Sequence, residues 1–207
     1  MVALSHGLWT AAGILGVKRA KKHAISAPWT IFWGVFPDFL AFTLIVLWYA
    51  FQLLQGESVR DLPAPIDIEP LAAGGLWILE LTSALYNIGH SAIVFGAVFA
   101  LVAILRRRVP FPMLGWAFHI VLDLFTHSYA VFPSPVLWPV AVFKFEGISW
   151  HQWWFTAANY TALIFVYAVI LTREHVGKAK TAVRRTAVRF GYARAAVKED
   201  TPVERMD

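Results

Sequence analysis

The stretch GWAFHIVLDLFTHS, residues 115–128, decides how this chain is interpreted. Its ionisable side chains His119, Asp123 and His127 stand four residues apart, and almost every residue between them is apolar. Four residues advance a helix by about 40° beyond one full turn and by about 6 Å along its axis. The spacing therefore predicts a helix that carries all three side chains on one face, within an arc of about 80°.

This face can offer ligands to a metal ion, but not all three to the same ion. His119 and His127 would lie about 12 Å apart along the helix axis, whereas zinc binds nitrogen and oxygen at about 2.0–2.2 Å. Either His119 with Asp123 or Asp123 with His127 can share one ion, and other helices must supply the remaining ligands. The alternative is a structural polar network in which Asp123 orients a histidine through a hydrogen bond.

The composition indicates a membrane protein. Of the 207 residues, 58% are hydrophobic and 15% are charged, and ten are tryptophan. Soluble domains are about half apolar and about a quarter charged. We expect an all-α, polytopic integral membrane protein with about four or five helical spans. The absence of cysteine excludes disulfides, thiolate metal sites and a thiol nucleophile.

Apolar runs mark the expected helices at residues 2–17, 28–54, 71–105, 110–127 and 153–171. Pro37 interrupts the second run, and a proline inside a helix removes a hydrogen bond and kinks or ends the helix. This run is therefore either one kinked span or a short helix followed by a longer one.

The last residues differ from the rest of the chain. Residues 173–207 carry half of all lysines and arginines, and apolar residues recur there at three- and four-residue steps. This pattern favours an amphipathic helix on the membrane surface, the alternative being a solvated tail. We therefore divide the chain into a transmembrane domain, 1–172, and a basic cytoplasmic tail, 173–207.

Basic clusters at residues 18–22 and 106–108 flank apolar runs, and the loop at residues 56–70 is acidic. Cytoplasmic loops carry an excess of Lys and Arg, so both clusters and the tail are expected in the cytoplasm and the acidic loop outside. The same placement favours anionic lipid headgroups as partners, and we do not expect nucleic acid.

Ionisable side chains within membrane segments are rare and usually functional. Outside the opening helix, four such residues lie in or beside apolar runs: His6, Asp38, Glu80 and His90. Two carboxylates and several imidazoles on different segments match the ligand preferences of zinc or manganese. Glu80 is either a candidate general base or a residue facing the outer headgroup region.

The order of these motifs resembles the bacterial inner-membrane metal-dependent hydrolases of the YdjM type, also described as LexA-binding membrane hydrolases. That family has an early histidine, a Pro-Asp, a His-Ser, a His-x-x-x-Asp helix and then a Trp-Pro. The matching stretches here are SHGLWTAAG from residue 5, GVFPDF from 34, GHSAIVFG from 89, FHIVLDLFTH from 118 and VLWPVAVFKFEG from 136. The resemblance covers about residues 1–147.

The resemblance implies a multi-pass protein of the inner membrane that holds a divalent metal, zinc or alternatively manganese. The implied metal ligands are His6, Asp38, His90, His119 and Asp123. His127 would lie in the second shell or contact phosphate. The family is similar in outline to helical zinc-dependent phospholipases C, which implies hydrolysis of phosphoesters, including those of lipids.

Two departures from the family pattern bear on the metal. The acidic residue that usually follows Pro-Asp is absent from residues 39–41, and TSALYNIG stands where His-Arg-Gly usually precedes His-Ser. A shell without those ligands would hold one metal instead of several, or none.

Three functions remain open from the sequence. The first is a metal-dependent phosphoester hydrolase. The second is a non-enzymatic membrane protein whose histidines and aspartates form a structural network or metal site. The third is an ion-coupled transporter, because intramembrane Asp and His also build proton relays. The chain contains neither G-x-S-x-G nor H-E-x-x-H, so the motifs of serine hydrolases and of many zinc proteases are absent.

Overall fold

The structure is a computed structural model that describes residues 3–20, 26–63 and 76–189. These residues form mostly helices and no strands, apart from two isolated bridges, which confirms the expected all-α class. The helices are α1 (Ala3–Ala20), α2 (Ala27–Leu54), α3 (Trp77–Gly89), α4 (Ala92–Arg106), the 3-10 turn η2 (Phe111–Met113), α5 (Leu114–Thr126) and α6 (Trp153–Arg189). The chain divides into two compact units, Met1–Leu163 and Ile164–Asp207. The boundary between these two units falls inside α6.

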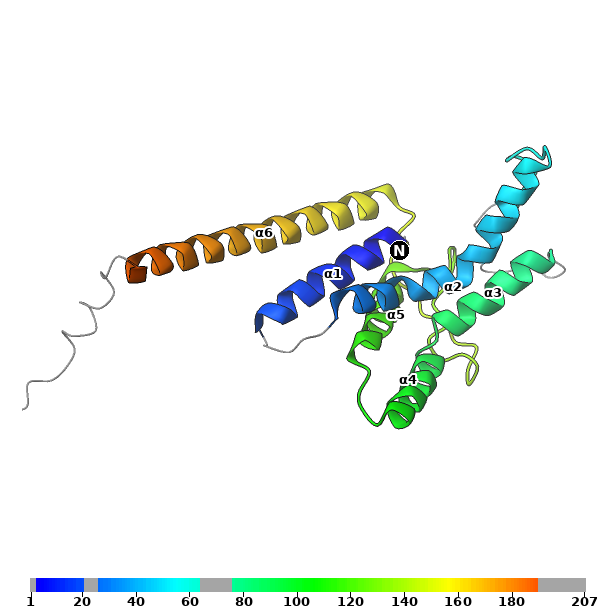
Figure 1. Cartoon of the computed structure of the whole chain (residues 1–207). Coiled ribbons are helices and arrows are strands. Elements are labelled where there is room, and N and C mark those ends of the chain that lie inside the picture. The colour runs from blue at the N-terminus through cyan, green and yellow to red at the C-terminus, as the bar shows by residue number, and fades with distance from the viewer. Residues whose placement is uncertain (1–2, 21–25, 64–75, 190–207) are drawn as a thin grey trace, which may run out of the picture. The chain divides into compact units, whose positions relative to one another are not determined.

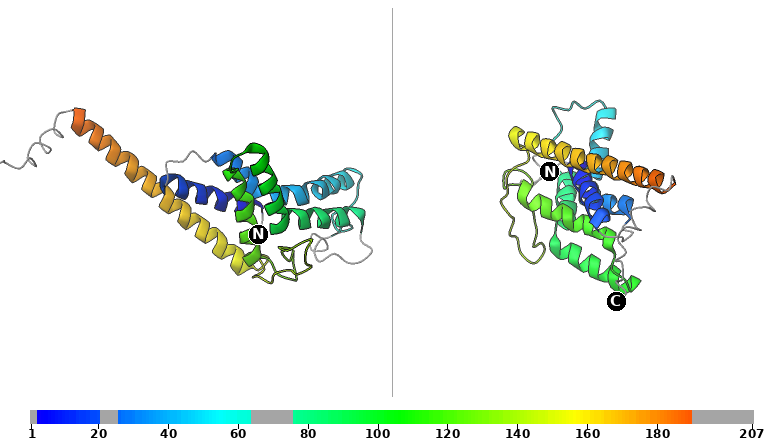
Figure 2. Two further views of the ribbon diagram at one scale, coloured as in Figure 1. Left: turned by 90° about the horizontal axis from the view of Figure 1, so that it is seen from below. Right: turned by 90° about the vertical axis from the view of Figure 1, so that its left-hand side faces the viewer.

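Helix α2 is the centre of the first unit. It is contacted by α1, α3 and α5, which Figures 1 and 2 show from three directions. Pro37 lies inside α2 and the helix continues through it, so the second apolar run is one helix and not two. Proline has no N–H to donate to the preceding turn. Asp38, the next residue, is buried at this point in the helix.

Glycines allow the other helices to approach α2 closely. A Cβ on Gly115 of α5 would collide with the Thr30 carbonyl oxygen of α2, and one on Gly34 would collide with the Thr10 side chain of α1. A Cβ on Gly89, the last residue of α3, would lie 3.2 Å from the Pro37 carbonyl oxygen. These close contacts place α1, α5 and the end of α3 against neighbouring parts of α2.

Helices α3 and α4 meet at a sharp bend of 61°. Ser91 is the N-cap of α4, and its Oγ accepts hydrogen bonds from the backbone N–H groups of Ile93 and Val94. Serine is a preferred N-cap because it satisfies these otherwise unpaired donors. The expected helix at residues 71–105 is thus broken, and residues 71–75 lie outside the described part.

Within the described residues, two helices are long and apolar enough to cross a membrane, α2 and the Trp153–Thr186 part of α6, and the bent α3–α4 pair counts as a third if it is one span. These two or three candidates fit membrane association but are fewer than the four or five spans expected. Helix α5 has 13 residues and is about 20 Å long, which is shorter than a hydrocarbon core of about 30 Å.

The smaller number of spans also changes the expected topology. Three crossings would separate the tail from residues 18–22 and 106–108. Two crossings, by α2 and α6, would instead separate residues 106–108 from the other two basic segments. The number of candidates that are true spans therefore decides which basic clusters share a side of the membrane.

Helix α6 runs from Trp153 to Arg189 without a break at Arg173, so the apolar span and the first part of the basic tail are one helix. The remaining tail, residues 190–207, lies outside the described residues, as do residues 21–25 with His23 and residues 64–70 of the acidic loop.

Candidate metal centre

Six buried ionisable residues meet in the first unit. They come from α1 (His6), α2 (Asp38), the α3–α4 break (His90), α5 (His119 and Asp123) and the residue after α5 (His127). Three of the histidine side chains are fully buried, those of His6, His90 and His119. The structure therefore brings together all five residues for which the sequence predicted a metal role, and His127 with them.

Asp123 lies at the centre of the cluster and uses its two oxygens differently. Its Oδ2 is 3.0 Å from His119 Nε2 and 3.3 Å from His90 Nε2. Its Oδ1 is 2.9 Å from His6 Nε2 and 3.2 Å from His127 Nε2. Both pairs that the sequence put forward, His119 with Asp123 and Asp123 with His127, are therefore in direct contact.

Asp38 divides its contacts in the same way. Its Oδ1 lies 3.5 Å from His90 Nε2 and 3.7 Å from His119 Nε2. Its Oδ2 lies 2.9 Å from His6 Nδ1. His6 therefore bridges the two carboxylates with its two ring nitrogens, whereas His90 and His119 each direct one nitrogen at both carboxylates.

Backbone carbonyls orient the rings of His90 and His119. His90 Nδ1 lies 2.9 Å from the Tyr86 carbonyl oxygen, and His119 Nδ1 lies 2.8 Å from that of Gly34. A carbonyl oxygen only accepts, so each Nδ1 donates its proton and each neutral ring keeps a lone pair on Nε2. Burial lowers the pKa of His119, and nearby His6 lowers it further, which favours this neutral form.

The two Nε2 atoms of His90 and His119 face each other at 3.1 Å. Two lone pairs at this distance repel, so either a proton on one of the two nitrogens or a metal cation must lie between them, and two carboxylates face the same point. Histidines whose other nitrogen donates to a backbone carbonyl are typical metal ligands in proteins. The arrangement can therefore hold a cation.

The distances fit a four-coordinate ion. Tetrahedral bonds of about 2.0–2.2 Å place neighbouring ligand atoms about 3.3–3.6 Å apart. Five distances connect His90 Nε2, His119 Nε2, Asp38 Oδ1 and Asp123 Oδ2, and they are 3.1, 3.5, 3.3, 3.7 and 3.0 Å. These five of the six distances among the four atoms lie close to the tetrahedral range.

A second ligand combination shares three of these residues. His6, Asp38, His119 and Asp123 each offer a ligand atom within 4.8 Å of all the others, so this buried group can also hold a metal ion. Asp38, His119 and Asp123 are common to both combinations. The fourth ligand is either His90 from the α3–α4 break or His6 from α1.

His127 reaches the cluster because α5 ends before it. Its backbone is extended, with φ −115° and ψ 151°, whereas the sequence predicted a helix through this residue. His127 Nδ1 lies 2.7 Å from the Phe132 carbonyl oxygen, and Phe132 has the left-handed φ of 54° that few residues of its type adopt. Burial lowers the pKa of His127 to about 3, so this ring is neutral.

Tyr86 supports two of the histidines, a role that the sequence did not reveal. Its hydroxyl donates to the Phe132 carbonyl oxygen at 2.7 Å and lies 2.9 Å from His127 Nδ1. Its ring stacks on that of His90, with centroids 4.0 Å apart. Tyr86 precedes His90 by one helical turn, and this spacing was the available signal.

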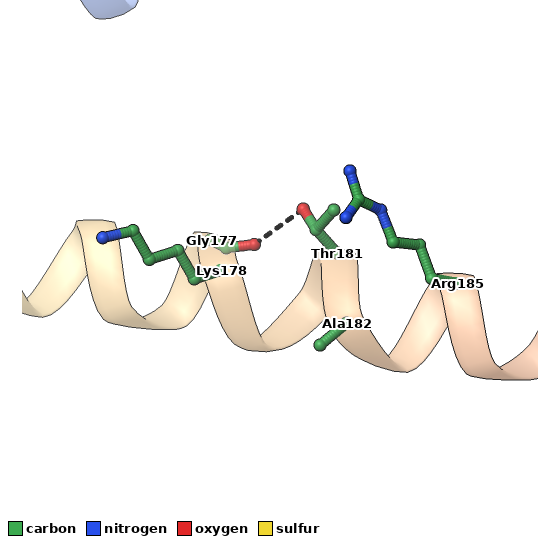
Figure 3. Close-up of a pocket in the computed structure, with 5 residues that line it drawn as sticks. All are labelled: Gly177, Lys178, Thr181, Ala182 and Arg185. Carbon is green, nitrogen blue, oxygen red and sulfur yellow. Dashed lines mark hydrogen bonds between the residues drawn. The ribbon is translucent and has the colours of Figure 1, made fainter.

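The remaining candidates lie apart from the cluster. Glu80 is exposed in the first turn of α3, ten residues and about 15 Å of helix before His90. His151 and His175 are exposed. A hollow along α6, lined by Gly177, Lys178, Thr181, Ala182 and Arg185, contains neither histidine nor carboxylate (Figure 3). Glu80 is therefore not positioned as a base at the cluster.

No protein-family model matches this sequence, and no curated protein or solved structure is significantly similar to it. The chemical interpretation of the cluster therefore rests on its own residues.

Proposed function

We propose that this protein is a metal-dependent hydrolase of phosphoesters in the bacterial inner membrane, similar to the YdjM-type family. The observation that carries the proposal is the contact between His90 Nε2 and His119 Nε2 at 3.1 Å, opposite two carboxylates. His90, His119, Asp38 and Asp123 would hold one divalent ion, zinc or alternatively manganese. Both carboxylates and both imidazoles suit these metals.

Such an ion would polarise the phosphate and lower the pKa of a bound water. Hydrolysis adds one water across the ester linkage: a new P–O bond forms to the water oxygen, and the P–O bond to the alcohol breaks. One proton of that water ends on the leaving alcohol oxygen. Because Glu80 lies apart from the cluster, no residue is assigned as the general base.

His6 and His127 would position Asp123. Both direct a ring nitrogen at its Oδ1, the oxygen that does not face His90 and His119. A carboxylate held in this way keeps its other oxygen aimed at the ion. Residues of this kind typically change metal affinity 10- to 100-fold when removed.

The test is hydrolysis of a chromogenic aryl phosphodiester and of the matching phosphomonoester by detergent-purified protein. The protein is stripped with a chelator and reloaded with zinc or manganese. The proposal predicts turnover that requires metal and that His119→Ala abolishes together with metal binding. Metal-independent turnover, or full turnover in His119→Ala, would contradict it.

A structural metal site is the second candidate, and the burial of the cluster favours it. His6, His90 and His119 expose none of their side-chain surface. A sealed ion would stabilise the packing of α1, α2 and α5 without reaching a substrate. Stoichiometric metal that raises the melting temperature, with no turnover of either phosphoester, would favour this function.

The proposed location is the inner membrane with the C-terminus in the cytoplasm. The tail carries half of the basic residues of the chain, and such residues favour the cytoplasmic side. A reporter enzyme that is active only in the periplasm, fused after residue 207, should be inactive. An active fusion would reverse the orientation.

A further inference from the structure

The first turn of α1 carries a residue of the cluster and is the part of that helix most easily displaced. Helix α1 begins at Ala3, so His6 lies three residues from its end. The first N–H groups of a helix lack partners within it, and helix ends open locally at little cost in free energy. His6 is nevertheless fully buried, so contacts with other helices must hold this turn in place.

The position of His6 tolerates little movement of α1. Its Nδ1 lies 2.9 Å from Asp38 Oδ2, and its Nε2 lies 2.9 Å from Asp123 Oδ1. The centroid of its ring is 3.8 Å from that of His119. Because the two nitrogens face different carboxylates, a shift or rotation of the first turn would break at least one of these contacts.

Asn159 of α6 makes hydrogen bonds to two residues of α1. The Trp9 Nε1–H donates to Asn159 Oδ1 at 2.8 Å, and Asn159 Nδ2 donates to Ser5 Oγ at 3.0 Å. An indole N–H can only donate, so Trp9 fixes which end of the amide faces it and leaves the NH₂ end for Ser5. Ser5 and Trp9 are four residues apart and therefore lie on one face of α1. The two bonds join Asn159 to the first two turns of that helix.

Two helices hold α1 from nearly opposite sides. Its close contacts with α2 involve Gly7 and Thr10. At about 100° per residue, the face of these two residues lies about 150° from the face that Asn159 binds, and His6 lies between the two faces. A helix held in this way cannot rotate about its axis without losing one set of contacts.

The surroundings make the two hydrogen bonds of Asn159 hard to replace. Ser5 is fully buried, and Trp9 and Asn159 are half-buried. Asn159 lies six residues after Trp153, the first residue of a candidate membrane span. An asparagine in such an apolar setting has little water to bind if it loses its partners, so hydrogen bonds of this kind hold neighbouring helices together.

We propose that Asn159 is a positioning residue of the cluster. Through its two hydrogen bonds it holds the first turns of α1 and thereby keeps His6 between the two carboxylates. The proposal rests on the role of His6 in the proposed function, but it requires no particular substrate. It also extends the site to α6, which lies beyond the motifs of residues 1–147.

The reactivity of single histidines with diethyl pyrocarbonate tests this proposal on metal-free protein. The reagent acylates accessible imidazole nitrogens, and peptide mass spectrometry gives a rate for each histidine in the detergent-purified protein. In the wild type, buried His6 and His119 should react slowly and exposed His151 fast. Asn159→Ala removes both hydrogen bonds. Thr161→Ala is the matched control, because the Thr161 hydroxyl donates to a carbonyl of its own helix.

Asn159→Ala should raise the rate at His6 by about tenfold or more, because the loss of two hydrogen bonds favours opening of the first turn by that order. His119 should keep its rate, and Thr161→Ala should change neither. Equal increases at His6 and His119, which indicate general unfolding, or an unchanged rate at His6 would overturn the proposal. If Asn159→Ala does not fold, Trp9→Phe removes one of the two bonds, keeps an aromatic ring and should give a smaller increase at His6 alone.

Zinc affinity in a double-mutant cycle separates positioning of His6 from general support of the fold. Asn159→Ala should weaken zinc binding about tenfold in the wild type, as expected for a residue that orients the site. It should have no further effect once His6 is replaced by alanine. An equal loss in both backgrounds would overturn the proposal.

The two proposals can fail separately. Selective labelling of His6 in Asn159→Ala, in a protein that binds no metal, would support the role of Asn159 and contradict the proposed function. Metal-dependent turnover of phosphoesters without selective labelling would support the proposed function and overturn the role of Asn159.

Discussion

The break between α3 and α4 and the first turns of α1 each contribute a histidine to the same two carboxylates, but the two histidines bind differently. His90, at the break, donates one nitrogen to the Tyr86 carbonyl and directs the other at Asp38, Asp123 and His119. His6, on α1, gives one nitrogen to each carboxylate. The two histidines therefore differ in the partner of the second ring nitrogen, which is a backbone carbonyl for His90 and a carboxylate for His6.

The largest expected effect comes from His119, one of the three residues that both ligand combinations share. His119→Ala should abolish stoichiometric zinc binding, because it removes a ligand and leaves both carboxylates buried without it. Metal content by mass spectrometry after dialysis measures this. Phe118→Ala, on the same helix but 36% exposed, is the control and should keep its metal.

Substituting His90 and His6 one at a time tests which of the two histidines is a metal ligand. His90→Ala should lose stoichiometric metal, whereas His6→Ala should keep it with an affinity about 10- to 100-fold lower. Competition with a chromogenic zinc chelator measures both affinities. If His6→Ala loses the metal and His90→Ala retains it, the fourth ligand is His6.

The dependence of metal affinity on pH tests whether imidazoles bind the metal. Protons compete with metal for imidazole nitrogens and carboxylates, and the lowered pKa of His119 moves its share of this competition to a pH below the ordinary histidine value of about 6.5. The ring of His119 is kept neutral by a lowered pKa, so its Nε2 remains available at pH 7. Affinity measured between pH 5 and 8 should rise with pH, and a flat profile would contradict imidazole ligation.

The smallest effect should come from Tyr86. Tyr86→Phe keeps the ring that stacks on His90 but removes the hydroxyl that donates to the Phe132 carbonyl. The loss of one hydrogen bond typically costs about 1 kcal/mol of stability. Thermal unfolding should show a small decrease, and metal affinity should change only a few-fold. A complete loss of metal would make this hydroxyl part of the site itself.

The sequence predicted the components of the site better than their arrangement. Ionisable residues in apolar runs identified His6, Asp38, His90, His119 and Asp123, because burying such groups is costly without compensation. Which nitrogen faces which oxygen depends on the glycine contacts with α2 and on the 61° bend between α3 and α4. Neither is encoded in the spacing of residues along one helix.

The fold, like the site, was predictable from the sequence only in part. Apolar length correctly predicted helices, but it could not distinguish a span from a helix that packs inside the first unit, as α5 does against α2. The position of His127 was predicted on a helix face because its spacing continues that of His119 and Asp123. The helix instead ends at Thr126, and the extended backbone turns His127 back toward Asp123.

X-ray absorption spectroscopy of the protein loaded with zinc tests whether the cluster binds a metal ion through imidazole nitrogens. We expect one zinc ion with four nitrogen or oxygen ligands at about 2.0–2.1 Å and the scattering pattern of two imidazoles. A protein that binds no stoichiometric zinc, or a spectrum without imidazole scattering, would contradict the account and make the cluster a hydrogen-bonded network.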